Sequence, residues 1–464
     1  MTRFRTPVGL ALLLAFALSA HAGPLKDHQG RWLGDMAIPN GPTLKIGAEF
    51  HTRADGSLWA SIASPDQGAY DQPVSRIRED GDTVELDLDV ATLTLTWADD
   101  HFNGVFSQGD GVFAFALHRV AQFPRKLRAQ TPTRPFPYDE QELAFTSADG
   151  TVLSATLSTP RASTRANLAV LVTGTGPATR DSEMAGHQHF AVMADYLARQ
   201  GIAVLRYDKR GNGRSTGNYA GLTTAQLVDD LAAIMGAMQA RAQFNRVGIV
   251  GLSEGPGIAA AVAARQPDAV DFIVSLAGVG MSGHGLLLLQ DRIHARDNGA
   301  SPAEVRQLMK YVRTWYQTIV AHPEPQPRVA ALKALVARLP AKDRALIKKY
   351  RMDVGSLSLS EAEKPHLRTA MLSNTQADWR KVAVPVLALN GSLDHQVPAR
   401  ENLAGIIGAL RAGGNRQVES AVLPSLNHLF QTAKTGNTDE YDRIEETIAP
   451  IALARIAAFV KKQD

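Results

Sequence analysis

Residues 247–255 read Val-Gly-Ile-Val-Gly-Leu-Ser-Glu-Gly, and a helix rich in alanine is expected directly after them. The first four residues are typical of a buried strand, and glycines stand two positions before and after Ser253. This spacing lets a strand turn sharply into a helix, so that the serine hydroxyl projects above the sheet. Because the chain has 38 glycines, an ordinary tight turn is the alternative, and the flanking strand and helix favour a nucleophile.

Strands and helices alternate on both sides of this turn. The expected core strands are residues 168–172, 202–207, 247–250, 272–276, 384–390 and 417–423, and the expected helices include 190–200, 224–240 and 439–461. Apolar strands separated by helices predict an α/β fold with a mostly parallel sheet. Helical patterns over about 283–377, including 302–316 and 340–350, interrupt the alternation and predict a cap.

A different pattern precedes this domain. Residues 84–88 and 92–96 alternate apolar and polar side chains, and Asp-Gly turns stand nearby, which predicts a small β-sandwich or barrel over residues 23–122. Residues 123–139 are rich in proline and predict an extended linker, in which the basic cluster 125–128 is expected to be solvated. The catalytic domain is then expected over 140–464, beginning with a hairpin.

The first 22 residues are typical of a secretory signal peptide. They combine Arg3 and Arg5, an apolar run over 8–18 and the sequence Ala20-His21-Ala22, so cleavage is expected before Gly23. A membrane anchor is the alternative, but the run is shorter than the roughly 20 residues that span a bilayer. The chain has no cysteine, which excludes disulfides and thiolate chemistry and agrees with export to a bacterial periplasm or medium.

Composition narrows the functional classes further. The chain is 45% hydrophobic and 20% charged, as in ordinary globular proteins. Its formal charge of +3 falls to +1 when Arg3 and Arg5 leave with the signal peptide. This balance argues against a nucleic-acid partner, and no later segment is expected to span a membrane.

A serine nucleophile needs a base, and an acid that orients the base. Residues 387–394 read Leu-Ala-Leu-Asn-Gly-Ser-Leu-Asp and residues 423–428 read Leu-Pro-Ser-Leu-Asn-His, so Asp394 and His428 each follow an expected strand. Because parallel strands end at one edge of a sheet, we expect Ser253, Asp394 and His428 to form a catalytic triad. Glu401 and Glu419 are alternative acids, but they fall within a helix and a strand.

Two glycine-rich loops follow other strands. Residues 173–177 read Thr-Gly-Thr-Gly-Pro, and we expect the N–H groups of Thr175 and Glu254 to form an oxyanion hole, with Gly176 the alternative to Thr175. Residues 208–215 read Asp-Lys-Arg-Gly-Asn-Gly-Arg-Ser. Neither loop completes a nucleotide-binding motif, so no cofactor is expected, and Asp208 and Arg210 are expected to tie the second turn together.

His187 and His189 have the spacing of a metal-ligand pair. No third group of ligands accompanies them in the sequence, so they are expected to be solvated or substrate-facing loop residues, and no metal is expected.

With these motifs the chain resembles exported bacterial α/β-hydrolases of the EstD esterase type, which are related to serine aminopeptidase-like hydrolases. The resemblance runs from about residue 136 to the C terminus and rests on residues 136–138, 147–150, 173–177, 207–211, 251–255, 389–394 and 426–431. It implies the α/β-hydrolase fold, the triad above and hydrolysis of short-chain carboxylic esters. Ala178-Thr179 and Glu254 depart from the pattern, which bears on substrate preference.

We therefore expect a carboxylesterase-type serine hydrolase that acts on a small-molecule ester through an acyl-enzyme intermediate. A serine peptidase or amidase is the nearest alternative, because the same triad cleaves either bond. A second alternative is a non-catalytic protein that binds a carbohydrate or cell-wall ligand on a hydrolase scaffold.

Overall fold

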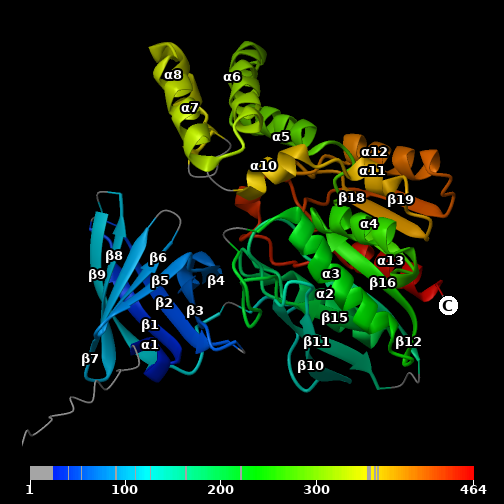
Figure 1. The fold of residues 1–464 in the computed structure, drawn as a ribbon, viewed down its shortest axis with the longest axis horizontal. Helices are drawn as coiled ribbons and strands as arrows, with labels where there is room; N and C mark the ends of the chain where they lie inside the picture. Colours follow the sequence, from blue (N-terminus) through cyan, green and yellow to red (C-terminus); the bar gives the residue numbers. More distant parts are fainter. Residues whose placement is uncertain are drawn as a thin grey trace, which may run out of the picture.

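The computed structural model describes residues 24–463, except residues 40, 54, 89, 90, 110, 126, 162–164, 220, 221, 353–356, 360, 361, 363 and 364. The expected signal peptide, residues 1–22, lies outside the described residues. Figure 1 shows a β domain beside an α/β domain, on which a group of helices stands. Among the helices that the structure describes, none has the length and apolarity to cross a membrane.

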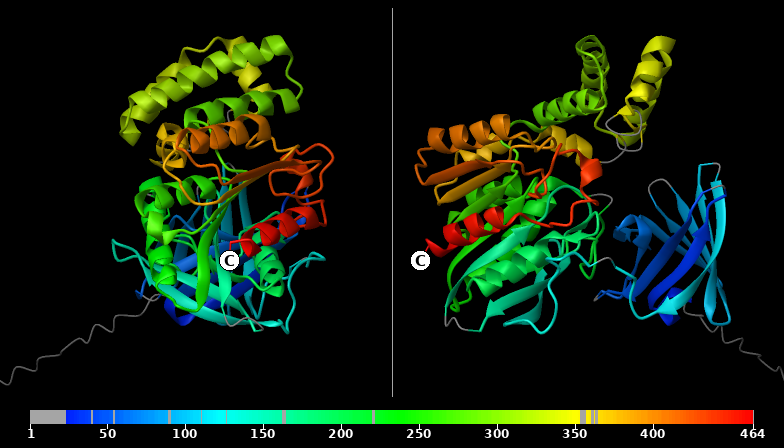
Figure 2. Two further views of the ribbon diagram at one scale, coloured as in Figure 1. Left: turned by 90° about the vertical axis from the view of Figure 1, so that its right-hand side faces the viewer. Right: turned by 180° about the vertical axis from the view of Figure 1, so that it is seen from behind.

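The β domain is a single antiparallel sheet of nine strands, in the order β4-β3-β2-β1-β9-β8-β7-β6-β5. Its strands are β1 (Gly30–Ala37), β2 (Thr43–Thr52), β3 (Leu58–Ser64), β4 (Ala69–Pro73), β5 (Arg76–Asp80), β6 (Thr83–Asp87), β7 (Thr92–Ala98), β8 (His101–Gln108) and β9 (Gly111–Val120). Alternation along the strands places Trp32, Phe50, Leu86 and Phe102 in one core. The sheet curls around this core (Figures 1 and 2).

The α/β domain contains a sheet of eight strands, in the order β10-β11-β15-β12-β16-β17-β18-β19. They are β10 (Tyr138–Thr146), β11 (Val152–Pro160), β12 (Ala166–Val172), β15 (Ala203–Tyr207), β16 (Phe244–Leu252), β17 (Ile273–Leu276), β18 (Val386–Gly391) and β19 (Val418–Leu423). The pairs β10–β11 and β11–β15 are antiparallel, and the remaining pairs are parallel. The carboxyl ends of β12, β15, β16, β18 and β19 therefore meet at one edge.

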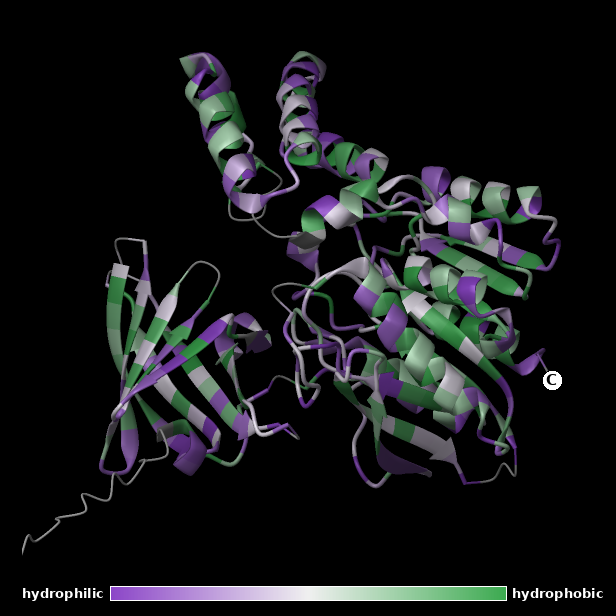
Figure 3. Ribbon diagram, viewed as in Figure 1, coloured by the Kyte–Doolittle hydropathy of each residue, from purple (hydrophilic) through white to green (hydrophobic). Residues whose placement is uncertain are grey.

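Helices cover both faces of this sheet. They are α2 (His189–Arg199), α3 (Thr224–Gln239), α4 (Gly255–Arg265), α12 (Ala399–Ala412) and α13 (Pro450–Lys461). One apolar core joins α3, α4 and α12 to the sheet, and a second joins α2 and α13 to the other face. The strands between them are correspondingly hydrophobic, as Figure 3 shows for β16 and β18.

The C-terminal helix is shorter than the sequence pattern predicts. A helix was expected over 439–461, but α13 begins at Pro450, whose ring suits the first turn of a helix. Only a short 3-10 turn, Thr438–Glu440, precedes it. The chain between them packs through Tyr441 and Thr447, which both hydrogen-bond to His187.

In the described part of the chain between β17 and β18, the structure has six helices. They are α5 (Gly283–Asp297), α6 (Pro302–Ala321), α7 (Pro325–Ala337), α8 (Ala341–Lys349), α10 (Pro365–Leu372) and α11 (Thr375–Trp379). The helices from α5 to α10 have an apolar core of their own, which includes Trp315, Tyr316 and Leu332. They rise from the edge of the sheet where the strands end (Figure 2).

The β domain contacts the α/β domain at two loops. His51 Nε2 lies 3.2 Å from the carbonyl oxygen of Gly213, and Arg53 donates to that of Gly211 at 2.9 Å. The Gly186 N–H donates to Gly68 O at 3.1 Å, in the turn between β13 (Glu183–Met184) and β14 (His187–Gln188). These contacts join the two domains near the edge where the core strands end.

The linker is more buried than the sequence predicts. The basic cluster 125–128 was expected to be solvated, but Arg128 is only 5% exposed. Its guanidinium donates to Glu445 at 3.2 Å and to the carbonyl oxygen of Asp442 at 2.6 Å. Arg125 pairs with Glu183 of the hairpin β13–β14. Both arginines therefore attach the linker to the α/β domain, a role that depends on partners far away in the sequence.

Candidate active site

Ser253 occupies the sharp turn between β16 and α4. Its φ is +60°, and its backbone N–H donates to Leu276 O at 2.9 Å. The backbone of a non-glycine residue is strained at this φ, so the packing around Ser253 must hold the turn in place. Gly255 allows the close packing, because a Cβ there would lie 2.4 Å from the carbonyl oxygen of Val172. Gly174 is equally confined, since its Cβ would lie 2.9 Å from Ser253 Cβ.

Asp394 and His428 form a buried pair. His428 Nδ1 donates to the two carboxylate oxygens of Asp394 at 2.9 and 3.1 Å. Both residues are at most 5% exposed. A proton fixed on Nδ1 leaves Nε2 as the acceptor of the ring, the state that a general base requires.

Three further donors hold the Asp394 carboxylate. The N–H groups of Gln396 and Val397 donate to Oδ1 at 2.9 and 2.8 Å, and Asn390 Nδ2 donates to Oδ2 at 3.0 Å. Asn390 is fully buried, and its amide also donates to the Val397 carbonyl at 2.8 Å. Asn390 was not predicted as a site residue, although it lies near the end of β18, four residues before the acid.

A buried lysine holds the loop 173–177. Lys209 Nζ donates to the carbonyl oxygens of Gly174 at 2.6 Å and Gly176 at 3.0 Å. The Gly174 carbonyl and the Thr175 N–H belong to one planar trans peptide, so they point in opposite directions. Lys209 therefore fixes the direction of the Thr175 N–H. The peptide that carries the Gly176 N–H has no such contact from Lys209.

Lys209 was not predicted as a site residue, because its loop was expected to be structural. Burial lowers the pKa of Lys209, and the negative charge of Glu254 opposes this shift. The loop itself is tied as predicted: Asp208 accepts from Arg180 and from the Arg214 N–H, while Arg210 pairs with Asp230 and Asp149. This framework places the lysine beneath the loop 173–177.

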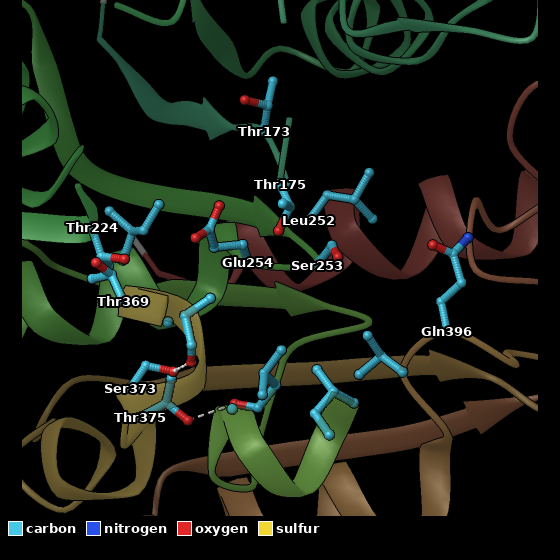
Figure 4. A pocket seen from close by; sticks show the side chains of 18 of the residues that line it. Thr173, Thr175, Thr224, Leu252, Ser253, Glu254, Thr369, Ser373, Thr375 and Gln396 are labelled. Carbon is cyan, nitrogen blue, oxygen red and sulfur yellow. Dashed lines mark hydrogen bonds between the residues drawn. The ribbon is translucent and has the colours of Figure 1, made fainter. Parts of the chain in front are cut away.

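One cavity of about 730 Å³ is lined by Ser253, His428, Thr175 and Glu254. Figure 4 shows Thr175 close to Ser253 and Glu254, with Thr224 and Gln396 on opposite sides of them. The walls of this cavity are largely apolar and include Val279, Leu286, Leu287, Leu367, Leu372 and Leu429. Its acidic lining residues are Glu183, Glu254 and Asp378, and no lysine or arginine among the described residues lines it. The cavity is large enough for a small organic ligand.

Neither of the two histidines near the site is solvated, and of the two expected alternatives the position of His189 agrees with the substrate-facing one. His187 is fully buried and hydrogen-bonds to Thr447 and to the carbonyl oxygen of Tyr441. His189 is 2% exposed and lines the cavity. Burial, with a smaller contribution from His187, lowers the pKa of His189 to about 3, so this ring is neutral near pH 7. In the part of the chain that the structure describes, no group of three potential metal ligands occurs.

A family model described as serine aminopeptidase, S33 (Hydrolase_4) matches residues 184–432. This region includes Ser253, Asp394, His428 and Lys209. No significant match is found among curated proteins.

Several solved structures resemble the chain distantly. The esterase Pf2001 of Pyrococcus furiosus has 17% sequence identity and a TM-score of 0.43, and the match covers 73% of this chain and 96% of that one. The hypothetical protein PA2218 of Pseudomonas aeruginosa has 15% sequence identity and a TM-score of 0.43, and the match covers 74% of this chain and 100% of that one. Proline iminopeptidase of Mycobacterium smegmatis has 16% sequence identity and a TM-score of 0.42, and the match covers 70% of this chain and 98% of that one.

Proposed function

The chain belongs to the serine aminopeptidase-like (S33) hydrolase family, whose model matches more than half of it, and from this premise we propose that it is a serine esterase for short-chain carboxylic esters. The α/β-hydrolase fold and hydrolase activity follow from the family. The single observation that carries the proposal is the arrangement of Ser253 and the Asp394–His428 pair around one largely apolar cavity. The preference for short acyl chains rests on the resemblance to EstD-type esterases.

The proposed mechanism is a two-step acyl transfer. His428 removes the Ser253 proton as the hydroxyl oxygen attacks the ester carbonyl, and Asp394 stabilises the resulting imidazolium. The N–H groups of Thr175 and Glu254 stabilise the oxyanion of the tetrahedral intermediate. The imidazolium then protonates the leaving alcohol. Water, deprotonated by His428, finally attacks the acyl-Ser253 ester and releases the acid.

The helices of residues 283–377 act, in this proposal, as a cap over the acyl site. The supporting observation is that α5 contributes Leu286 and Leu287 to the cavity and α10 contributes Leu367 and Leu372. An apolar wall of this kind suits the hydrocarbon part of an ester.

The proposal is tested by Ser253→Ala, with hydrolysis of p-nitrophenyl acetate as the measurement. We expect hydrolysis near background and an unchanged far-ultraviolet circular dichroism spectrum. Labelling of the wild-type protein by a fluorophosphonate, absent in the variant, would also exclude a non-catalytic scaffold. Substantial turnover by Ser253→Ala would refute the assignment.

One observation favours a second candidate, cleavage of aminoacyl amides. The described part of the cavity is lined by the acidic residues Glu183, Glu254 and Asp378 and by no lysine or arginine, which suits a substrate with a free amino group. A panel of short-chain esters beside aminoacyl p-nitroanilides distinguishes the two. Higher kcat/KM for the anilides would replace the esterase proposal.

Export to the periplasm or medium is a further part of the proposal, supported by the pattern of residues 1–22. We expect expression in a bacterial host to yield a mature chain that begins at Gly23. N-terminal sequencing of the periplasmic fraction measures this, and an intact leader on the cytoplasmic protein would contradict it.

A further inference from the structure

The helices above the site carry a second, basic groove. It lies between α5 and α6 and has a volume of about 520 Å³. Five of its nine lining residues are basic, namely Arg292, Arg296, Arg306, Lys310 and Arg313. The other four are Ala300, Pro302, Val305 and Met309, so its floor is apolar.

Among the described residues, no acidic side chain pairs with the five basic side chains of the groove. Within the described residues, none of them forms a side-chain hydrogen bond or an ion pair, and neighbouring acids are engaged elsewhere. Glu304 accepts from the Ser301 N–H and pairs with Lys349, while Asp297 pairs with His395. A concave surface with charges of one sign concentrates ions of the other sign.

The spacing of the charges indicates the shape of the ligand. Arg306, Lys310 and Arg313 lie four and three residues apart on α6, so they share one face and span about 10 Å along the axis. Arg292 and Arg296 form a second row on α5. A single small anion contacts only part of these rows. A ligand that meets both rows and the apolar floor must carry negative charge beside a hydrocarbon segment.

We propose that this groove binds an anionic phospholipid, with phosphate groups against the two basic rows and the start of an acyl chain over Val305 and Met309. Basic side chains attract anionic lipid surfaces, and their aliphatic stems extend the apolar floor. Nucleic acids and acidic polysaccharides present charge without the hydrocarbon that the floor accommodates. The binding site does not depend on the proposed function.

The groove has a structural connection to the cavity through α5. Leu286, Leu287 and Gln290 of this helix line the cavity, and Arg292 and Arg296 line the groove. A phospholipid bound in the groove would therefore contact the same helix that lines the cavity. If the esterase proposal holds, this position brings lipid-borne esters close to the site.

Co-sedimentation of the full chain with vesicles tests the proposal. We expect binding to phosphatidylcholine vesicles that contain phosphatidylglycerol, and no binding to phosphatidylcholine alone. The triple variant Arg306→Gln, Lys310→Gln, Arg313→Gln should bind about 100-fold more weakly, since each charge contributes about fivefold near such a surface. Glutamine preserves the helix propensity of α6. Unchanged p-nitrophenyl acetate hydrolysis and circular dichroism show that the variant is folded.

A matched control removes the same charge elsewhere, by Arg411→Gln, Arg416→Gln and Arg455→Gln. These side chains are exposed and do not line the groove. Equal losses in the two triple variants would show non-specific attraction and overturn the site. Displacement from vesicles by inorganic phosphate at low concentration would identify a simple anion site instead. Binding of heparin or single-stranded DNA without vesicle binding would also overturn the proposal.

The single variant Lys310→Gln keeps the test decisive if the triple variant fails to fold. We expect a fivefold weaker interaction with the phosphatidylglycerol vesicles, from the loss of one charge at about 1 kcal/mol. Wild-type affinity in this variant and in Arg306→Gln alone would contradict the proposal.

Discussion

The two halves of the candidate site are held in place by different means. Asp394 is held locally, by Asn390 and by the N–H groups of Gln396 and Val397. The loop 173–177 is held from a distance, by Lys209 at the end of another strand. The acid half thus has several short-range donors, whereas the loop that carries the Thr175 N–H depends on one long-range cation. The two halves should therefore differ in how they respond to the loss of one group.

The largest effect is expected from the acid half itself, in Asp394→Asn. An amide at this position offers its NH₂ group to His428 and favours the wrong tautomer, so kcat should fall by roughly 10⁴. Steady-state hydrolysis of p-nitrophenyl acetate measures this. The control Asp439→Asn makes the same chemical change at an exposed residue and should leave kcat unchanged. Activity of Asp394→Asn within tenfold of wild type would mean that another acid serves His428.

Substitution of Lys209, which holds the loop 173–177, should cause the next largest fall in kcat. Lys209→Met removes both hydrogen bonds to the loop 173–177. The Thr175 N–H, the proposed oxyanion donor, then loses its fixed direction, and kcat should fall by roughly 10²–10³. KM should change much less. Lys209→Gln retains one donor and should recover part of the loss.

A trifluoromethyl ketone inhibitor provides a second measurement for Lys209. It mimics the oxyanion, so its affinity should fall in parallel with kcat in the methionine variant. Lys333→Met, at an exposed lysine of α7, is the control. A lower melting temperature with unchanged kcat would show that Lys209 only stabilises the fold.

A smaller effect is expected for Asn390→Ala, which removes one of the three donors to Asp394 besides His428. Two backbone donors still hold Asp394 in this variant, so kcat should fall only about tenfold, while unfolding becomes about 1–3 kcal/mol easier because buried acceptors lose a partner. Kinetics and urea denaturation measure the two quantities. A loss of kcat as large as that in Lys209→Met would show that the backbone donors alone do not hold Asp394 in position.

The smallest effect concerns the hairpin β13–β14, which the linker contacts. Burial raises the pKa of Glu183 to about 7, against the opposing charge of Arg125, and raises that of nearby Asp71 to about 6. An acid with a raised folded-state pKa favours the folded state fully below its unfolded pKa, and this contribution is lost as pH rises through the folded value. Stability should therefore decline between about pH 4.5 and pH 7.

Glu183→Gln cannot ionise, so it should make that decline shallower. Thermal unfolding at a series of pH values across this window measures the slope, and Glu140→Gln, at another paired carboxylate, is the control. An unchanged slope in Glu183→Gln would show that Glu183 does not titrate in this range.

The sequence predicts the parts of the fold and site that depend on local patterns. The core strands and α2, α3 and α4 follow from apolar runs and helical periodicity, and the turn at Ser253 follows from its glycines. Asp394 and His428 are recognisable because each closely follows a strand. Lys209 and Arg128 were not recognisable, since their partners lie far away in sequence and a basic side chain in a loop usually remains in water. The start of α13 was misjudged because residues 441–449 pack as irregular chain against His187.

The contacts of His51 and Arg53 link the β domain to the α/β domain, so they bear on where the chain can be truncated. They cover the carbonyl groups of Gly211 and Gly213, in the same loop as Lys209. A truncated chain that starts at the linker would leave these groups to water, directly next to the support of the Thr175 peptide. We therefore expect a chain that starts at the proline-rich segment to lose part of its hydrolase activity, because the β domain helps to hold the loop that carries Lys209.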